Sequence, residues 1–138
     1  MREYPIALIT GATSGIGESC AHKFAQAGYR LVLNGRRSGL LETLKKELER
    51  TGAQVLTLPF DVRDRQAARQ AIETLPREWG DIDVLVNNAG LARGLEPEYE
   101  GCPEDWDEMI DTNIRGLLTM TRLVVPGMVA RDHGHVIN

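Results

Sequence analysis

The chain has 138 residues, of which 42% are hydrophobic and 26% charged, and this profile of one ordinary globular domain excludes a disordered or fibrous protein. Its 20 Asp and Glu outnumber its 16 Lys and Arg, and the net charge of -4 argues against nucleic acid or an anionic membrane as main partner. Cys20 and Cys102 are too few for a disulfide framework or metal cluster, and no apolar run suits a signal peptide or membrane span, so we expect a cytoplasmic protein.

The first half of the chain alternates short apolar runs with segments of helical period. A strand is predicted over 6–10, followed by a helix with a left-handed C-cap at Gly28 and an inward stripe of Ile16, Cys20, Phe24 and Ala27. The second strand is Leu31–Leu33. The helix after it is predicted to be capped by Ser38, to end at Gly52 and to turn Leu41, Leu44 and Leu48 inward.

The second half repeats the alternation. A strand over 55–60 precedes a third helix that carries Ala68, Ile72, Leu75 and Trp79 on one face, with Pro76 near its end. A strand over 82–86 then leads to a long helix from Pro103 to about Met128, in which Pro126 predicts either a kink or an early end. Residues 134–138 begin another strand.

This order of elements predicts an α/β fold. Continuous apolar strands that alternate with helices are typical of a doubly wound parallel sheet, the Rossmann fold, here truncated after the fifth strand. We therefore predict that residues 1–138 are one domain and the N-terminal part of a longer single-domain protein. An uncovered sheet edge would make the isolated chain poorly soluble or partly ordered.

A glycine-rich turn follows the first strand. Gly11, Gly15 and Gly17 flank Thr13, Ser14 and Ile16 between a buried strand and an amphipathic helix. Unpaired N–H groups at a helix N-terminus attract a pyrophosphate, glycines let the backbone approach it, and hydroxyls add donors. We interpret the turn as a phosphate-binding site; the alternative is a simple tight turn.

The glycine spacing and two further motifs resemble those of the short-chain dehydrogenase/reductase family. The motifs are Thr10–Gly17, Asp61-Val62 after the third strand, and Asn87-Asn88-Ala89-Gly90 after the fourth. The resemblance implies that Asp61 and Val62 contact adenine, and that Asn88, Ala89 and Gly90 lie along the cofactor ribose. It also implies that Asn87 braces the centre of the sheet.

The residues after the second strand predict which cofactor binds. A site for NAD needs a carboxylate here for the ribose 2′-hydroxyl, whereas a 2′-phosphate needs cations. The chain has no acid in Asn34-Gly35-Arg36-Arg37, and the two guanidinium groups suit a phosphate. We predict NADP(H); the alternative is that Arg36 and Arg37 belong to a solvated loop. Arg36 also argues against a methyltransferase, which would need a carboxylate at this place.

Asn113 falls on the apolar stripe of the long helix, where a buried amide needs a partner. The resemblance implies that Asn113 is a catalytic residue that holds a proton-relay water; the alternative is a structural Asn bonded to a neighbouring main chain. Off the stripe the helix is also apolar, at Leu118, Leu123 and Val125, which predicts a second buried surface and hence a homo-oligomer. The resemblance implies a dimer or tetramer through the helix around 104–128.

The resemblance also implies what this sequence lacks. The family's general acid is a Tyr with a Lys four residues later, but Tyr4, Tyr29 and Tyr99 are followed at that distance by Leu8, Leu33 and Pro103. The family's catalytic Ser, expected just after the fifth strand, is absent as well. Stretches 75–79, 82–92 and 105–113 look most like the NADP-dependent serine/3-hydroxy acid dehydrogenase branch.

Two hypotheses follow. The parent protein would be an NADP(H)-dependent oxidoreductase that transfers a hydride between the nicotinamide and a secondary alcohol or carbonyl, such as a 3-hydroxy acid. Alternatively, the chain as it stands is a catalytically incompetent module that binds a dinucleotide.

Overall fold

A computed structural model describes residues 4–138, which form a five-stranded parallel sheet. The strands, in the spatial order β3-β2-β1-β4-β5, are β1 (Ile6–Ile9), β2 (Arg30–Gly35), β3 (Val55–Pro59), β4 (Val84–Val86) and β5 (His135–Ile137). β1 is central and pairs Ile9 with Leu33 on one side and with Val86 on the other. The predicted doubly wound α/β fold is confirmed.

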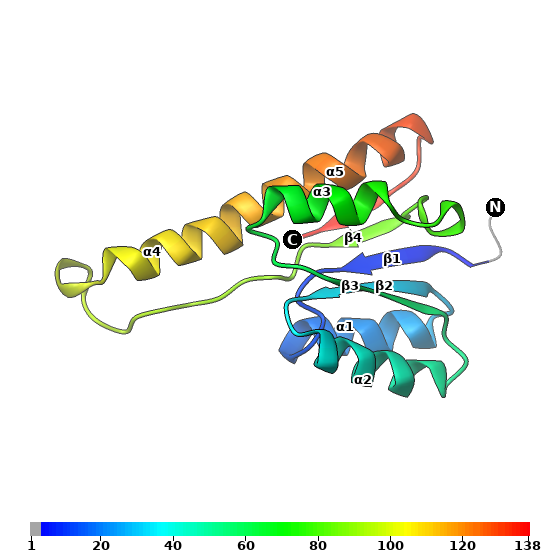
Figure 1. Ribbon diagram of the computed structural model, residues 1–138, viewed down its shortest axis with the longest axis horizontal. Coiled ribbons are helices and arrows are strands. Elements are labelled where there is room, and N and C mark those ends of the chain that lie inside the picture. Colours follow the sequence, from blue (N-terminus) through cyan, green and yellow to red (C-terminus); the bar gives the residue numbers. More distant parts are fainter. Residues whose placement is uncertain (1–3) are drawn as a thin grey trace.

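Helices cover both faces of the sheet (Figure 1). α1 (Gly15–Gln26) and α2 (Ser38–Glu49) lie on one face, and α3 (Arg65–Glu73) and α5 (Leu117–Ala130) lie on the other. α4 (Pro103–Ile110) continues the line of α5 and projects beyond the sheet. The carboxyl ends of β1, β2 and β4 meet at one edge, because all the strands run parallel.

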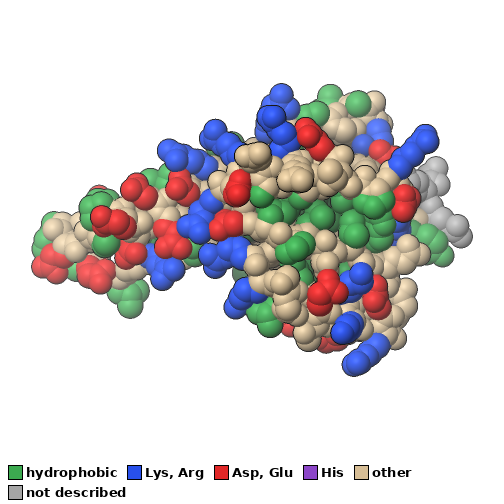
Figure 2. Space-filling model, viewed as in Figure 1, with side chains coloured by type: hydrophobic (Ala, Val, Ile, Leu, Met, Phe, Trp, Pro, Cys, Tyr) green, Lys and Arg blue, Asp and Glu red, His purple; other side chains and the backbone are tan. Residues whose placement is uncertain are grey.

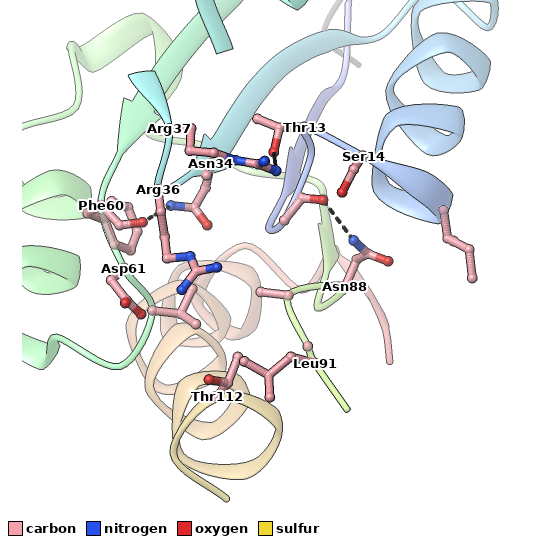
Figure 3. Close-up of a pocket in the computed structure, with 16 residues that line it drawn as sticks. Thr13, Ser14, Asn34, Arg36, Arg37, Phe60, Asp61, Asn88, Leu91 and Thr112 are labelled. Carbon is pink, nitrogen blue, oxygen red and sulfur yellow. Dashed lines mark hydrogen bonds between the residues drawn. The ribbon is translucent and has the colours of Figure 1, made fainter. Parts of the chain in front are cut away.

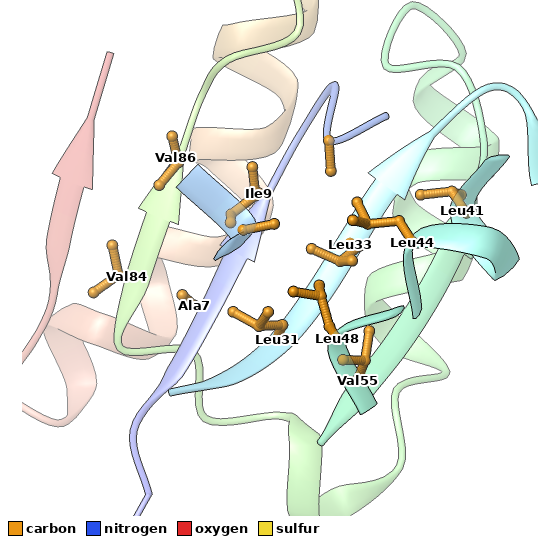
Figure 4. Close-up of a cluster of buried hydrophobic side chains, with 12 residues drawn as sticks. Ala7, Ile9, Leu31, Leu33, Leu41, Leu44, Leu48, Val55, Val84 and Val86 are labelled. Carbon is orange, nitrogen blue, oxygen red and sulfur yellow. The ribbon is translucent and has the colours of Figure 1, made fainter. Parts of the chain in front are cut away.

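The sheet divides the core into two clusters of buried side chains. Alternate residues of a strand point to opposite faces, so that Ala7 and Ile9 belong to the cluster under α2, while Ile6 and Leu8 belong to the cluster under α5. The first cluster, shown in Figure 4, contains the predicted inward stripe of α2. The second contains Met120, Val124 and Met128 of α5.

Helix α1 uses only part of the predicted face: Cys20 and Phe24 pack against the first core cluster as predicted, but the two ends of the stripe do not. Ile16 is 76% exposed and Ala27 is exposed, whereas Gly17 and Ala21 are buried against the sheet. The cause lies in the first turn of α1, which approaches the glycine turn so closely that a side chain at position 17 would overlap the carbonyl oxygen of Gly11. Gly28 has a φ of 83° and ends the helix as predicted.

Two other predicted helix boundaries are wrong. α2 begins at Ser38 itself, so that its N-cap residue is Arg37. α3 ends at Glu73, because the residue before Pro76 is disfavoured in a helix and Pro76 lacks an N–H donor. Leu75 and Trp79 still pack against the second core cluster, but from a loop and a short 3-10 helix (Arg77–Trp79).

The long helix begins at Pro103 as predicted and continues through Pro126 to Ala130. Its middle, Asp111–Gly116, is a π-helical segment. This segment breaks the 3.6-residue period, and Asn113 is exposed instead of lying on a buried stripe. The predicted second apolar face is also smaller than expected: Leu118 is exposed, but Leu123 and Val125 pack against the core.

The π-helical segment buries a hydroxyl without a partner. Oγ1 of Thr112 makes no hydrogen bond within the described part of the chain, which costs about 1–3 kcal/mol. We expect Thr112→Val, which keeps the shape, to raise the free energy of unfolding in urea by about 1 kcal/mol. Thr121→Val, which removes the acceptor of Asn87 Nδ2 at 3.1 Å, is the matched control and should lower it. A less stable Thr112→Val protein would contradict the unpaired hydroxyl.

No helix within residues 4–138 is long and apolar enough to cross a membrane. Both cysteines are free.

Candidate functional site

A cavity of about 290 Å³ lies at the carboxyl ends of the central strands (Figure 3). It lies where the glycine turn after β1, the loops after β2 and β3, and the segment after β4 converge. This is the edge where α/β sheets bind ligands. The lining residues are Gly11, Thr13, Ser14, Ile16, Asn34, Gly35, Arg36, Arg37, Phe60, Asp61, Val62, Asn88, Ala89, Gly90, Leu91 and Thr112.

The glycine turn needs its glycines for two different reasons. Gly11 and Gly15 have φ values of 61° and 55°, which side chains rarely adopt. Gly17 is required for space, since a Cβ there would overlap the carbonyl oxygen of Gly11 and the side-chain amide of Asn88. Ser14, the N-cap residue of α1, makes no side-chain cap bond. Its hydroxyl is therefore not engaged by the first amides of α1, and Ser14 and Ile16 bring the start of this helix to the cavity.

Thr10 ties the two motifs of the site together. It is 1% exposed, and its Oγ1 accepts hydrogen bonds from the backbone N–H groups of Asn88 (3.0 Å) and Ala89 (2.9 Å). Nδ2 of Asn88 in turn donates to the carbonyl oxygens of Thr10 (3.2 Å) and Gly11 (3.0 Å). The Asn88 side chain thus fixes the backbone at the start of the glycine turn, a role that the sequence did not predict.

Two guanidinium groups stand at the end of β2. Arg36 and Arg37 are both exposed, and Nη2 of Arg37 donates to Oγ1 of Thr13 at 3.1 Å. Asn34, which is 1% exposed, donates from Nδ2 to the carbonyl oxygens of Leu58 and Phe60 and so fixes β2 against β3 at this point. The end of β2 therefore presents positive charge and no carboxylate.

Asp61 brings a negative charge to the far side of the cavity, and Figure 3 shows it near Arg36. Burial raises the pKa of its carboxyl, but hydrogen bonds and charge from Arg63 outweigh burial, and the net pKa is below its ordinary value. Because the pKa of Asp61 is lower in the folded than in the unfolded protein, ionised Asp61 stabilises the fold at pH values above its unfolded pKa. This stabilisation is lost as the pH falls through the pKa of the folded state. Asp61 is therefore ionised near neutral pH.

The side chains of Asn113 and Asn87 both form hydrogen bonds with other segments of the chain. Asn113 accepts from the N–H of Leu91 and donates to its carbonyl oxygen, each at 2.8 Å. Asn87 donates from Nδ2 to Thr121 Oγ1 of α5 and to Asn138 Oδ1 just beyond β5. These contacts join the segment after β4 to α5 and to the residue after β5, beside the central strand β1 and not on it.

The cavity gathers most of the predicted binding residues. Three predicted residues do not line it: Gly15, Gly17 and Asn113. The two glycines shape the turn, and the side chain of Asn113 packs against Gly90. Asn34, Gly35, Phe60, Leu91 and Thr112 line it without having been predicted. Their positions next to the motifs were the only available hint. Within residues 4–138, no group of three or more His, Cys, Asp or Glu side chains is placed to hold a metal ion.

Comparison with protein families matches residues 5–138 to the short chain dehydrogenase family. The chain is 53% identical over 133 residues to the NADP-dependent 3-hydroxy acid dehydrogenase YdfG of Salmonella typhi, covering 96% of this chain and 52% of that protein. It is 44% identical over 131 residues to the serine 3-dehydrogenase of Rhizobium radiobacter, covering 95% of this chain and 51% of that protein.

Solved structures agree. The serine dehydrogenase of Escherichia coli superposes with a TM-score of 0.91 at 50% identity, covering 96% of this chain and 60% of that one. A closed form of serine dehydrogenase complexed with NADP+ gives 0.92 at 50% identity, covering 96% and 52%. The chain thus spans about half the length of the curated relatives that it matches. The similarity to the serine/3-hydroxy acid dehydrogenase branch, predicted from the sequence, is confirmed.

Proposed function

Because this chain belongs to the short chain dehydrogenase family, we propose that it is the cofactor-binding part of an NADP(H)-dependent oxidoreductase. The reaction is a hydride transfer between the nicotinamide and a secondary alcohol or carbonyl. The names of the similar proteins support a 3-hydroxy acid such as serine as the substrate. We also propose a cytoplasmic location, which rests on the composition alone.

The observation that carries the proposal is the charge pattern around the cavity. The N-terminus of α1 and the hydroxyls of Thr13 and Ser14 suit a pyrophosphate. Arg36 and Arg37 suit a 2′-phosphate, which a carboxylate at the end of β2 would repel. The residues present therefore fit NADP(H) better than NAD(H).

The remaining lining residues would hold the rest of the cofactor. Asp61 and Val62 would contact the adenine, and Asn88, Ala89 and Gly90 would lie along the ribose. When bound, the nicotinamide supplies or accepts the hydride. Asn113 would hold a relay water, and the π-helical segment that contains it supports this role, because such segments displace carbonyl oxygens from the regular helical bonds.

A second candidate is that the chain by itself binds the dinucleotide without turnover. It is favoured by the absence of a Tyr followed four residues later by Lys anywhere in the sequence. Such a pair supplies the general acid that reduction of a carbonyl requires.

Titration with NADPH, followed by its fluorescence, tests the proposal. We expect saturable binding to the 138-residue chain, with NADH at least about tenfold weaker. Turnover of NADP+ with serine or 3-hydroxy acids by this chain would exclude the second candidate. A chain that is folded but binds neither dinucleotide would contradict both.

We further propose a homo-oligomer through the helix of residues 103–130. Its exposed apolar side chains include Ile110 (43%), Ile114 (53%) and Leu118 (59%). Residues 96–111 are rich in Asp and Glu and contain no Lys or Arg, and Figure 2 shows this acidic end projecting from the body. A groove of about 320 Å³ between α3 and α5 is lined by four arginines: Arg65, Arg69, Arg115 and Arg122. Antiparallel pairing would place the acidic end of one copy over the arginines of the other.

Reversing the charge of the groove tests this pairing. We expect the wild-type protein to be a dimer or larger by light scattering, and Arg69→Glu combined with Arg122→Glu to weaken association by about tenfold or more. Arg50→Glu, at the end of α2, is the matched control. A wild-type chain that stays monomeric at high micromolar concentration would argue against the interface.

A further inference from the structure

The carboxylate of Asp61 lines the cavity, and it forms hydrogen bonds with Arg63, which does not line the cavity. Arg63 donates to the Asp61 carboxylate from its backbone N–H (3.0 Å to Oδ1), from Nε (3.2 Å to Oδ1 and 3.1 Å to Oδ2) and from Nη2 (2.7 Å to Oδ2). Both carboxylate oxygens are thus engaged by one residue. A planar guanidinium that contacts both oxygens fixes the plane of the carboxylate as well as its charge.

The guanidinium of Arg63 is itself held from its other side. Its Nη1 lies 3.7 Å from Oε1 of Glu108 on α4. Glu108 also pairs with Arg93, whose Nε lies 3.1 Å from Oε2. Arg63 therefore stands between two carboxylates that belong to separate elements, and only one of them faces the cavity.

An ionised carboxylate only accepts hydrogen bonds. The exocyclic amino group of adenine is a donor, whereas the corresponding group of hypoxanthine is a carbonyl and an acceptor. A carboxylate held at a fixed angle can therefore distinguish the two bases, while one free to rotate and to bind water discriminates less.

We infer that Arg63 is a positioning residue that orients the Asp61 carboxylate toward the amino group of adenine, and thereby makes the site selective for adenine over hypoxanthine dinucleotides. This inference rests on the proposed binding of NADP(H). Arg63 also lowers the pKa of Asp61, which keeps the acceptor ionised at neutral pH.

A purely structural role is the competing explanation. Arg63 lies in the turn where the N–H of Asp64 donates to the carbonyl oxygen of Asp61, and Asp64 caps α3 by accepting from Ala67. If Arg63 only stabilises this turn, its loss weakens every dinucleotide equally. The ratio of two affinities separates the two roles, whereas a single affinity does not.

The experiment measures Kd for NADPH and for its hypoxanthine counterpart with the wild-type chain, Arg63→Met, Arg63→Lys and the control Arg50→Met. We expect the wild type to prefer adenine by about tenfold, the effect of one hydrogen bond to a charged group. Arg63→Met should reduce this preference by about threefold or more. Arg63→Lys should reduce it less, because lysine keeps the positive charge but not the planar guanidinium group. The control Arg50→Met should leave the preference unchanged.

Equal weakening of both dinucleotides by Arg63→Met, with the wild-type preference kept, would overturn the inference and leave the proposed function intact. If Arg63→Met does not fold, as judged by circular dichroism, Arg63→Lys decides by the same ratio: a reduced preference supports the inference and an unchanged one overturns it. A wild-type chain that binds neither dinucleotide would overturn the inference together with the proposed function.

Discussion

Replacing Arg36 and Arg37 together by alanine is expected to raise the Kd for NADPH by about 100-fold, while the Kd for NADH changes by less than about threefold. A charge-assisted hydrogen bond contributes about 1.5–3 kcal/mol, and two of them to a 2′-phosphate give at least this factor. NADH has no such phosphate, so that its remaining contacts with the glycine turn are unaffected.

The single variants should differ, because the two side chains are held differently. Arg37 is already bonded to Thr13 Oγ1, so that Arg37→Ala also frees a hydroxyl of the glycine turn. Arg36 is exposed beside Asp61, which competes with a phosphate for its charge. We expect Arg36→Ala to affect only NADPH and Arg37→Ala to have a small effect on NADH as well.

The measurement is a pair of fluorescence titrations at fixed ionic strength, since screening weakens contacts between exposed charges. Arg50→Ala controls for the loss of positive charge in general. Equal losses of affinity for NADPH and NADH in the double variant would show that the two arginines do not contact the 2′-phosphate.

The sheet and the glycine turn were predictable because their causes are local. Continuous apolar runs between helical segments indicate a buried parallel sheet, and all five predicted strands occur in it. Gly11 and Gly15 mark the turn because their φ values exclude most side chains. The residues of the motifs therefore gather at one edge once the sheet is known.

The remaining features depend on contacts between distant segments. The exposed position of Asn113 results from the π-helical segment, which no period in the sequence announces. The contacts of Thr10 with Asn88 and Ala89 join residues about 78 positions apart, so that a Thr at the end of a strand shows nothing of them beforehand. The inner face of α1 was mispredicted at its first turn, where Ile16 is exposed, because the approach of the glycine turn, and not hydrophobicity, selects Gly17.

Gly17→Ala should therefore be the most damaging small substitution at the site. The added Cβ would overlap the carbonyl oxygen of Gly11 and the Nδ2 of Asn88, and it would lie 2.9 Å from the carbonyl carbon of Gly11. Backbone cannot move aside as a side chain can, and overpacking of this kind costs about 1–3 kcal/mol. We expect the melting temperature to fall by about 10 °C and NADPH affinity to fall by about tenfold or more, because the hydrogen bonds of Asn88 hold the phosphate-binding turn.

Gly39→Ala is the matched control for the same chemical change. Gly39 lies in the first turn of α2, and a Cβ there would meet nothing within 4 Å. Alanine is favoured over glycine in a helix by about 1 kcal/mol, so this variant should melt a few degrees higher and bind NADPH as the wild type does. Because both variants add one methyl group to a helical glycine, opposite shifts isolate the contact with the glycine turn as the cause. A Gly17→Ala protein as stable as Gly39→Ala would mean that α1 is free to move away from the turn.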